Sequence, residues 1–193
     1  AAARQIGAVV LSDECYAMLD WRAGQGGVAP CALDLQVCEG SADGVLVLYS
    51  LSKQSNMAGY RTAFIAGDYA LVSRMTAYRK QIGQIIPGPV QAAMAEALRD
   101  TDAMREQKSR YERRLTALVQ ALRAYGYDAE MPQGALYVWV KARSGDCWQD
   151  MADLAQLGVV PSPGEFYGAP DHLRFSATAT DGAIADACRR LGA

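Results

Sequence analysis

Short apolar runs alternate with longer amphipathic stretches along this chain of 193 residues. The first part holds three runs that are rich in β-branched and apolar residues and have the length of buried strands: 8–12 (AVVLS), 44–50 (GVLVLYS) and 63–67 (AFIAG). Apolar residues then recur at helical spacing over 69–82, 89–100 and 104–126. Strands that alternate with helices in this way predict an α/β fold.

The pattern changes after Gly126, a typical residue for the end of a helix. The remaining elements are shorter: two strands within 127–142 around a Pro-Gln-Gly turn, a helix at 147–157, strands at 159–161 and 172–178, and a closing helix at 181–191. We therefore expect a boundary inside the long helix, with one domain at residues 1–107 and a small domain at 108–193.

The first domain begins in an unusual way, because AAARQIG (1–7) resembles the tail of a helix that runs straight into a strand. Three apolar strands with one unpaired edge would leave an exposed apolar surface that favours association. We therefore expect the chain to be the C-terminal portion of a larger protein.

Composition and charge narrow the class of protein. The net charge is -2 and the 19 basic residues are spread along the chain, so the sequence does not show the clustered basic residues typical of nucleic-acid binding. The apolar runs are too short to span a bilayer and no signal peptide is evident, so we expect a cytoplasmic protein without a membrane partner. The 5 cysteines follow no metal or redox spacing, and His172 is the single histidine, so we expect no metal site and a structural or incidental role for these residues.

Polar side chains of complementary chemistry follow the first two strands. In open parallel sheets, ligands bind beyond the carboxyl ends of the strands. The residues at those positions offer an acid, a phenol, two hydroxyls, an amine and a guanidinium: Asp13, Tyr16, Ser50, Ser52, Lys53 and Arg61. If the strands are neighbours, this set suits a phosphorylated aromatic aldehyde, because the amine can bond to the aldehyde, the hydroxyls and guanidinium can bind phosphate, and the acid can pair with a ring nitrogen.

SLSKQSNMAGYR (50–61) resembles the pyridoxal-phosphate lysine motif of the class I and II aminotransferases of fold type I, which runs Ser-x-Ser-Lys and then Gly-Trp/Tyr-Arg. Further stretches resemble the same family in the same order: SDECY (12–16), PQGALYVWV (132–140), VVPSPGEFYG (159–168) and HLRFSAT (172–178). The resemblance covers the whole chain and looks closest to the actinobacterial-type N-succinyldiaminopimelate aminotransferases. It implies the C-terminal part of the large domain, with a mostly parallel sheet, followed by a small α+β domain.

The resemblance implies that the cofactor is pyridoxal 5′-phosphate. Lys53 would bond to the cofactor aldehyde and, once displaced by substrate, act as the base that moves a proton at the substrate α-carbon. Asp13 would pair with the pyridine nitrogen and keep it protonated, and Tyr16 would hydrogen-bond to the 3-oxygen.

The same resemblance implies the remaining contacts and the reaction. Ser50, Ser52 and Arg61 would hold the phosphate, and Arg174 would bind the substrate α-carboxylate. An amino group would pass from an amino acid to a 2-oxo acid by a ping-pong mechanism, with N-succinyl-LL-2,6-diaminopimelate and 2-oxoglutarate as the expected pair. The protein would be a homodimer in which IIPGPVQ (85–91) approaches the partner's phosphate, and the family's Asn-Pro-rich stretch would lie upstream of this chain.

Other interpretations stay open at this point. The same residues would serve a pyridoxal-phosphate-dependent carbon–sulfur β-lyase, since any α-carbanion needs them. The chain could also be a non-catalytic fragment that associates through its open sheet edge. Taken singly, Lys53 is typical of a solvated loop and Arg174 of an edge charge, while Tyr137 and Trp139 are typical of a small-domain core.

Overall fold

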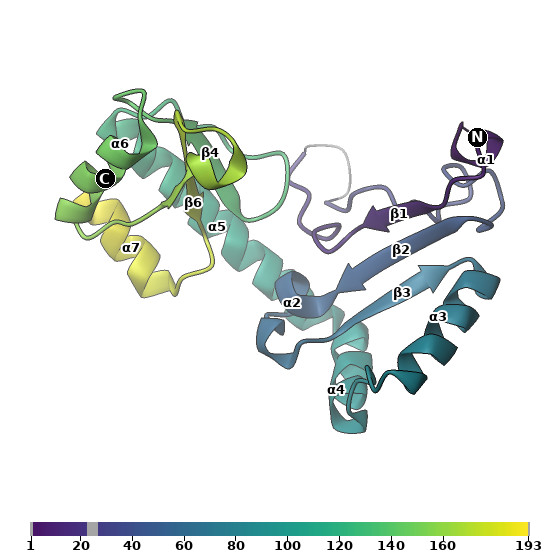
Figure 1. Cartoon of the computed structure of the whole chain (residues 1–193). Helices are drawn as coiled ribbons and strands as arrows, with labels where there is room; N and C mark the ends of the chain where they lie inside the picture. The colour runs from purple at the N-terminus through teal and green to yellow at the C-terminus, as the bar shows by residue number, and fades with distance from the viewer. Residues whose placement is uncertain (1, 23–26, 193) are drawn as a thin grey trace. The chain divides into compact units, whose positions relative to one another are not determined.

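The computed structural model describes residues 2–22 and 27–192 of the chain. The chain divides into two compact units, residues 1–107 and residues 108–193 (Figure 1). The division lies within helix α5, Thr101–Tyr125, which is followed by Gly126 in the left-handed region at φ 104°.

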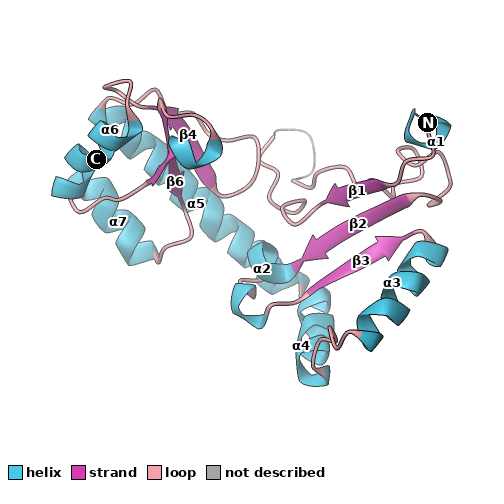
Figure 2. Cartoon of the chain, viewed as in Figure 1, coloured by secondary structure: helices cyan, strands magenta, loops and turns pink. Residues whose placement is uncertain are grey.

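The first unit is built on a sheet of strand order β1-β2-β3 (Figure 2). Strands β1, Val10–Asp13, and β2, Val45–Ser50, are parallel. Strand β3, Ala63–Gly67, runs antiparallel to β2, so this sheet is mixed. The connection over residues 51–62 holds only a single helical turn and a short 3-10 helix, whereas a parallel return usually contains a full crossover helix.

Burial in this sheet differs from the sequence-based expectation of three buried strands. Only the central strand β2 is buried, with Val45, Leu46 and Val47 at most 7% exposed. Strand β1 is largely exposed, and Leu11 keeps 66% of its surface. The expectation was wrong for β1 and also for β3, which has no fully buried residue, because burial depends on neighbours that an apolar sequence alone does not supply.

Helices complete the first unit; those over 69–81 and 88–99 lie close to their predicted positions, whereas the helical turn over 51–54 was not predicted. They are α1 at Ala2–Gln5, α2 at Leu51–Gln54, α3 at Tyr69–Gln81 and α4 at Gly88–Arg99, with the 3-10 helix η1 at Ala58–Tyr60. Asp68 caps α3 by accepting a hydrogen bond from the Leu71 amide, and it also accepts one from the Gly44 amide. Residues 27–43 form turns and irregular backbone without a helix or strand, and residues 23–26 lie outside the described part.

The second unit has an antiparallel sheet of order β4-β6-β5. Its strands are β4 at Tyr137–Lys141, β5 at Ser162–Pro163 and β6 at His172–Ser176. Helices α6, Cys147–Gln156, and α7, Asp181–Arg190, match their predicted ranges, and the 3-10 helix η2 covers Gly164–Tyr167. The sheet and its helices form the α+β unit that the sequence predicted.

Two strand predictions in this unit were inaccurate. The stretch 127–142 forms one strand rather than two, because Pro132 lacks an N–H group and Ala135 has a left-handed backbone at φ 63°. The strand expected at 159–161 lies instead at 162–163, and it is short because Pro163 cannot donate to the ladder.

The two faces of the β4–β6 pair differ sharply in character. Val138, Val140, Leu173 and Phe175 point to one face and are at most 4% exposed. The opposite face carries the alternate residues of the same strands: Tyr137, Trp139, Lys141, His172, Arg174 and Ser176. Within the described residues, no helix combines the length and apolar character that crossing a bilayer requires.

Candidate active site

The strand directions of the first unit bring the predicted residues to one edge of its sheet. Asp13 ends β1 opposite Leu48, and Ser50 ends the parallel strand β2, so both strands finish at the same edge. Ser50 also pairs with Ala63, the first residue of the antiparallel strand β3. Arg61 lies just before that strand, so the antiparallel direction of β3 places Arg61 at this edge.

Ser50 and Ser52 form a connected hydroxyl pair where β2 turns into α2. Ser50 is the N-cap residue, and its Oγ accepts a hydrogen bond from the Ser52 amide at 3.2 Å. The two Oγ atoms are 2.8 Å apart, and the Ser50 hydroxyl also donates to the Thr62 carbonyl at 3.1 Å. These bonds fix Ser50, which is 8% exposed, and leave Ser52 half-buried at the surface of the turn.

Lys53 stands on α2 with its side chain half-buried. Its Nζ lies 5.9 Å from the centroid of the Tyr16 ring, a cation–π distance. Among residues 2–22 and 27–192, no carboxylate forms an ion pair with this ammonium group. The structure therefore brings Lys53 and Tyr16 together without committing the amine to an acid.

Asp13 is exposed at the end of β1 and is tied to Cys15. The Cys15 amide donates to Asp13 Oδ1 at 3.1 Å. Hydrogen bonds from the Cys15 thiol and amide hold the pKa of Asp13 below its usual value, so this carboxylate is ionised at neutral pH. Burial, with the Asp13 carboxylate as the next cause, raises the pKa of Cys15 to about 11, so the thiol stays protonated and can donate.

Cys15 is a residue of this edge that sequence reasoning assigned to structural or incidental roles. The electrostatic neighbours of its thiol are Asp13, Ser50 and Lys53, so it lies within the candidate set. Its place two residues after Asp13, at the end of a strand, was the signal that could have identified it.

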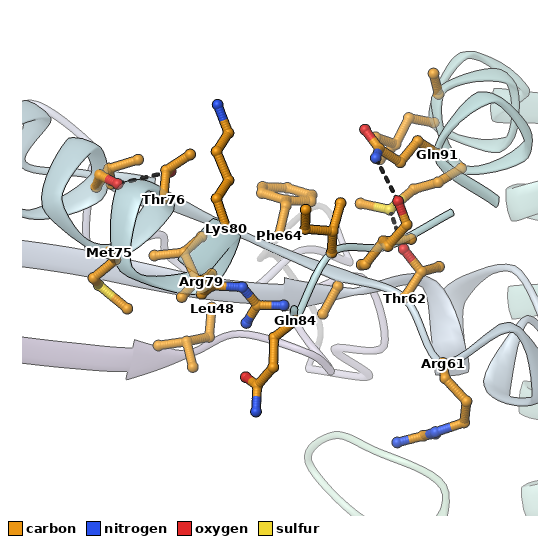
Figure 3. Close-up of a pocket in the computed structure, with 18 residues that line it drawn as sticks. Leu48, Arg61, Thr62, Phe64, Met75, Thr76, Arg79, Lys80, Gln84 and Gln91 are labelled. Atoms are coloured by element: carbon orange, nitrogen blue, oxygen red, sulfur yellow. Dashed lines mark hydrogen bonds between the residues drawn. The ribbon is translucent and has the colours of Figure 1, made fainter. Parts of the chain in front are cut away.

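Arg61 is exposed and has a left-handed backbone at φ 52°. One of its terminal nitrogens donates to the Ala58 carbonyl at 3.0 Å, which holds the side chain against η1. Arg61 also borders a cavity of about 900 Å³ formed by side chains of β3, α3 and α4. In Figure 3 Arg61 lies below Thr62 at the margin of the labelled lining residues, and no other residue of the predicted set lines that cavity.

Arg174 belongs to the second unit, where it lies on the central strand β6 opposite both Trp139 and Ser162. The interpretation as an edge charge is therefore wrong. Its guanidinium carbon is 4.3 Å from the Tyr137 ring centroid and 4.4 Å from that of Tyr167. Trp139 is 42% exposed, so its assignment to the core was also wrong, while Tyr137 is half-buried.

Comparison with known proteins identifies the family. The chain belongs to the aminotransferase class I and II family, whose model matches residues 1–191. It is 43% identical over 192 residues to 4-dedimethylamino-4-oxo-anhydrotetracycline transaminase OxyQ of Streptomyces rimosus, covering 98% of this chain and 52% of the relative. It is 29% identical over 194 residues to LL-diaminopimelate aminotransferase of Oleidesulfovibrio alaskensis, covering 98% of this chain and 49% of the relative.

A solved structure supports the same family. The aminotransferase of Neisseria meningitidis Z2491 superposes with a TM-score of 0.84 at 25% identity, covering 98% of this chain and 50% of that chain. The α/β fold of a fold type I aminotransferase is thereby confirmed, and the chain spans about half the length of the relatives that it matches. Enzymes of this family depend on pyridoxal phosphate.

Proposed function

We propose that this chain supplies one wall of a pyridoxal-phosphate site in an enzyme that transfers an amino group from an amino acid to a 2-oxo acid. The observation that carries the proposal is the position of Lys53, a half-buried residue whose amine has no carboxylate partner among the described residues and lies against Tyr16. An amine in this setting is available to an aldehyde, whereas an ion-paired lysine is not.

The other residues at this edge fit the remaining parts of the same cofactor. Asp13 is ionised and exposed, so it can accept a hydrogen bond from a protonated pyridine nitrogen. Ser52 and Arg61 offer a hydroxyl and a guanidinium for the phosphate, with Ser50 holding Ser52 in place. The donor set is thus complementary to an aldehyde, a ring nitrogen and a phosphate together.

The chemistry divides between the cofactor and this chain. When bound, pyridoxal phosphate withdraws electrons from the substrate α-carbon. Lys53 Nζ would take the proton from that carbon as general base and would then donate it to the C4′ carbon of the cofactor as general acid. Tyr16, whose ring contacts this amine, would donate its O–H to the 3-oxygen and orient the ring.

The substrate pair that we propose is N-succinyl-LL-2,6-diaminopimelate with 2-oxoglutarate, with the α-carboxylate bound by Arg174. The match to an LL-diaminopimelate aminotransferase supports a diaminopimelate-type donor. The higher identity to OxyQ, a transaminase named for a 4-oxo-anhydrotetracycline, favours a bulky ring ketone as the alternative amino acceptor.

We further propose that the working enzyme is a cytoplasmic homodimer that contains additional sequence beyond these residues. The length of the relatives, about twice that of this chain, supports the need for a further portion. In such a dimer residues 85–91, which include the first turn of α4, would approach the partner's phosphate.

An amino-transfer assay tests this proposal in the protein as encoded by its native gene. Glutamate formed from 2-oxoglutarate is measured with each candidate donor, alongside release of pyruvate and thiol from cysteine conjugates. We expect donor-dependent glutamate in the wild type, loss of at least about 10³-fold in Lys53→Ala, since the reaction loses its base, and little change in Lys80→Ala on the exposed face of α3. Pyruvate and thiol without glutamate would establish a lyase instead.

A further inference from the structure

The exposed face of the second unit's sheet surrounds Arg174 with aromatic rings from two other elements. Tyr137 comes from β4, and Tyr167 ends the 3-10 helix η2. Both rings contact the same guanidinium, at 4.3 and 4.4 Å from its carbon atom. We use the name aromatic clamp for the set Arg174, Tyr137 and Tyr167. All three residues lie within the second unit.

The rings of the aromatic clamp contact the Arg174 guanidinium without using its hydrogen-bond donors. A cation–π contact uses the electrostatic field of the ring face, whereas the guanidinium donors lie in the plane of the group. Arg174 Nε is buried and has no hydrogen-bond partner, and no carboxylate of residues 2–22 or 27–192 forms an ion pair with this side chain. A buried N–H group without an acceptor is costly, so an incoming acceptor would relieve that cost.

Tyr167 is itself fixed by its surroundings. Its ring packs edge-on against Trp139 with centroids 5.9 Å apart, and Trp139 in turn stacks on His172 at 5.2 Å. Trp139 is also the direct cross-strand partner of Arg174. The position of the ring over the guanidinium is therefore set by a chain of contacts from η2 to β4 and β6.

We propose that Tyr137 and Tyr167 are positioning residues that orient the Arg174 guanidinium to receive a carboxylate, and that they set the strength of that binding. The inference rests on the proposed role of Arg174 in substrate binding. A planar carboxylate is the anion that matches a guanidinium fork in its own plane, by two parallel hydrogen bonds. With the rings removed, the long arginine side chain would regain rotational freedom and lose part of its binding energy.

Nuclear magnetic resonance on the full chain tests the clamp without any need for enzyme turnover. The Nε–H resonance of Arg174 is identified by its absence from Arg174→Lys and followed during titration with propionate, with propionamide as the uncharged control. We expect saturable shifts with propionate alone. Tyr167→Leu and Tyr137→Leu should each raise the Kd about tenfold, while Tyr167→Phe and Tyr137→Phe, which keep the ring, should bind like the wild type.

Phe166→Leu provides the matched control, because it removes an aromatic ring from the adjacent position of η2. Phe166 is 70% exposed and packs on Trp148 rather than on the clamp, so this variant should leave the Kd unchanged. Equal Kd values in the Tyr→Leu variants and the wild type would overturn the clamp and leave the amino-transfer proposal standing. Saturable, clamp-dependent binding in a protein that forms no glutamate would overturn the proposed function and keep the clamp.

Discussion

In the second unit, one buried carboxylate accepts hydrogen bonds from several parts of the chain. Asp150, on α6, is 4% exposed and accepts hydrogen bonds from the Tyr127 hydroxyl at 2.8 Å and from the amides of Arg143 and Ser144 at 2.6 and 3.0 Å. Burial raises the pKa of Asp150, but the hydrogen bonds from Ser144, Tyr127 and Arg143 together outweigh it and leave the pKa below its usual value. The ionised carboxylate therefore stabilises the folded state.

Substitution of Asp150 measures how much this carboxylate contributes to the free energy of unfolding. We expect Asp150→Asn to lower the free energy of unfolding by about 2 kcal/mol at pH 7, since the charged acceptor is lost. Because the folded-state pKa is depressed, the wild-type contribution is complete above about pH 4 and declines as the pH falls below that value. Urea unfolding at pH 7 and at low pH measures both effects.

Asp153→Asn is the control for this experiment, because Asp153 lies on the same helix and is exposed. It should change stability by less than about 0.5 kcal/mol. If Asp150→Asn kept the same loss of stability at low pH as at pH 7, the carboxylate would not be the group responsible.

The sequence predicted which residues lie at the candidate site where their order along the chain was sufficient. It did not predict contacts that depend on side-chain packing. The set Asp13, Tyr16, Ser50, Ser52 and Lys53 was found because strand ends of a parallel pair meet at one edge. Cys15 and Tyr167 were missed, since a thiol beside a carboxylate and a ring over a guanidinium are visible only after folding. The roles of these residues in catalysis stay proposals.

The positions of helices and strands were predicted more accurately than the directions of the strands. The helices at 69–81 and 147–156 lie within a residue of their predicted ends, because periodicity and capping are local signals. The antiparallel course of β3 was not predictable, since an apolar run of five residues fits either direction. Edge exposure of β1 likewise depends on which strands lie beside it.

The turn that carries Tyr167 depends on a glycine. A Cβ atom at Gly164 would lie well inside contact distance of the Ala169 and His172 carbonyl oxygens. We expect Gly164→Ala to displace η2 and to destabilise the second unit by about 2 kcal/mol, measured by urea unfolding. Gly182→Ala on α7, where a Cβ meets nothing within 4 Å, should be neutral or slightly stabilising. Equal stability of the two variants would show that the turn tolerates a side chain.

The molecule as a whole pairs two units of different character. The first presents the Lys53 edge together with an exposed β1 strand and two helices, α3 and α4, that bury no residue completely. The second has a closed antiparallel core and presents Arg174 on its opposite face. The sequence motifs assigned both parts to one enzyme family, and the family match over residues 1–191 confirms that assignment.

The central claim, that Lys53 is the lysine that holds pyridoxal phosphate, can be tested chemically. The protein is incubated with stoichiometric pyridoxal phosphate and reduced with borohydride, and the modified peptide is identified by mass spectrometry. The chain carries lysines at positions 53, 80, 108 and 141, so a surface reaction would distribute over several of them. We predict that the phosphopyridoxyl group is found on Lys53 alone. Modification shared evenly among the four lysines, or undiminished in Lys53→Ala, would contradict the account.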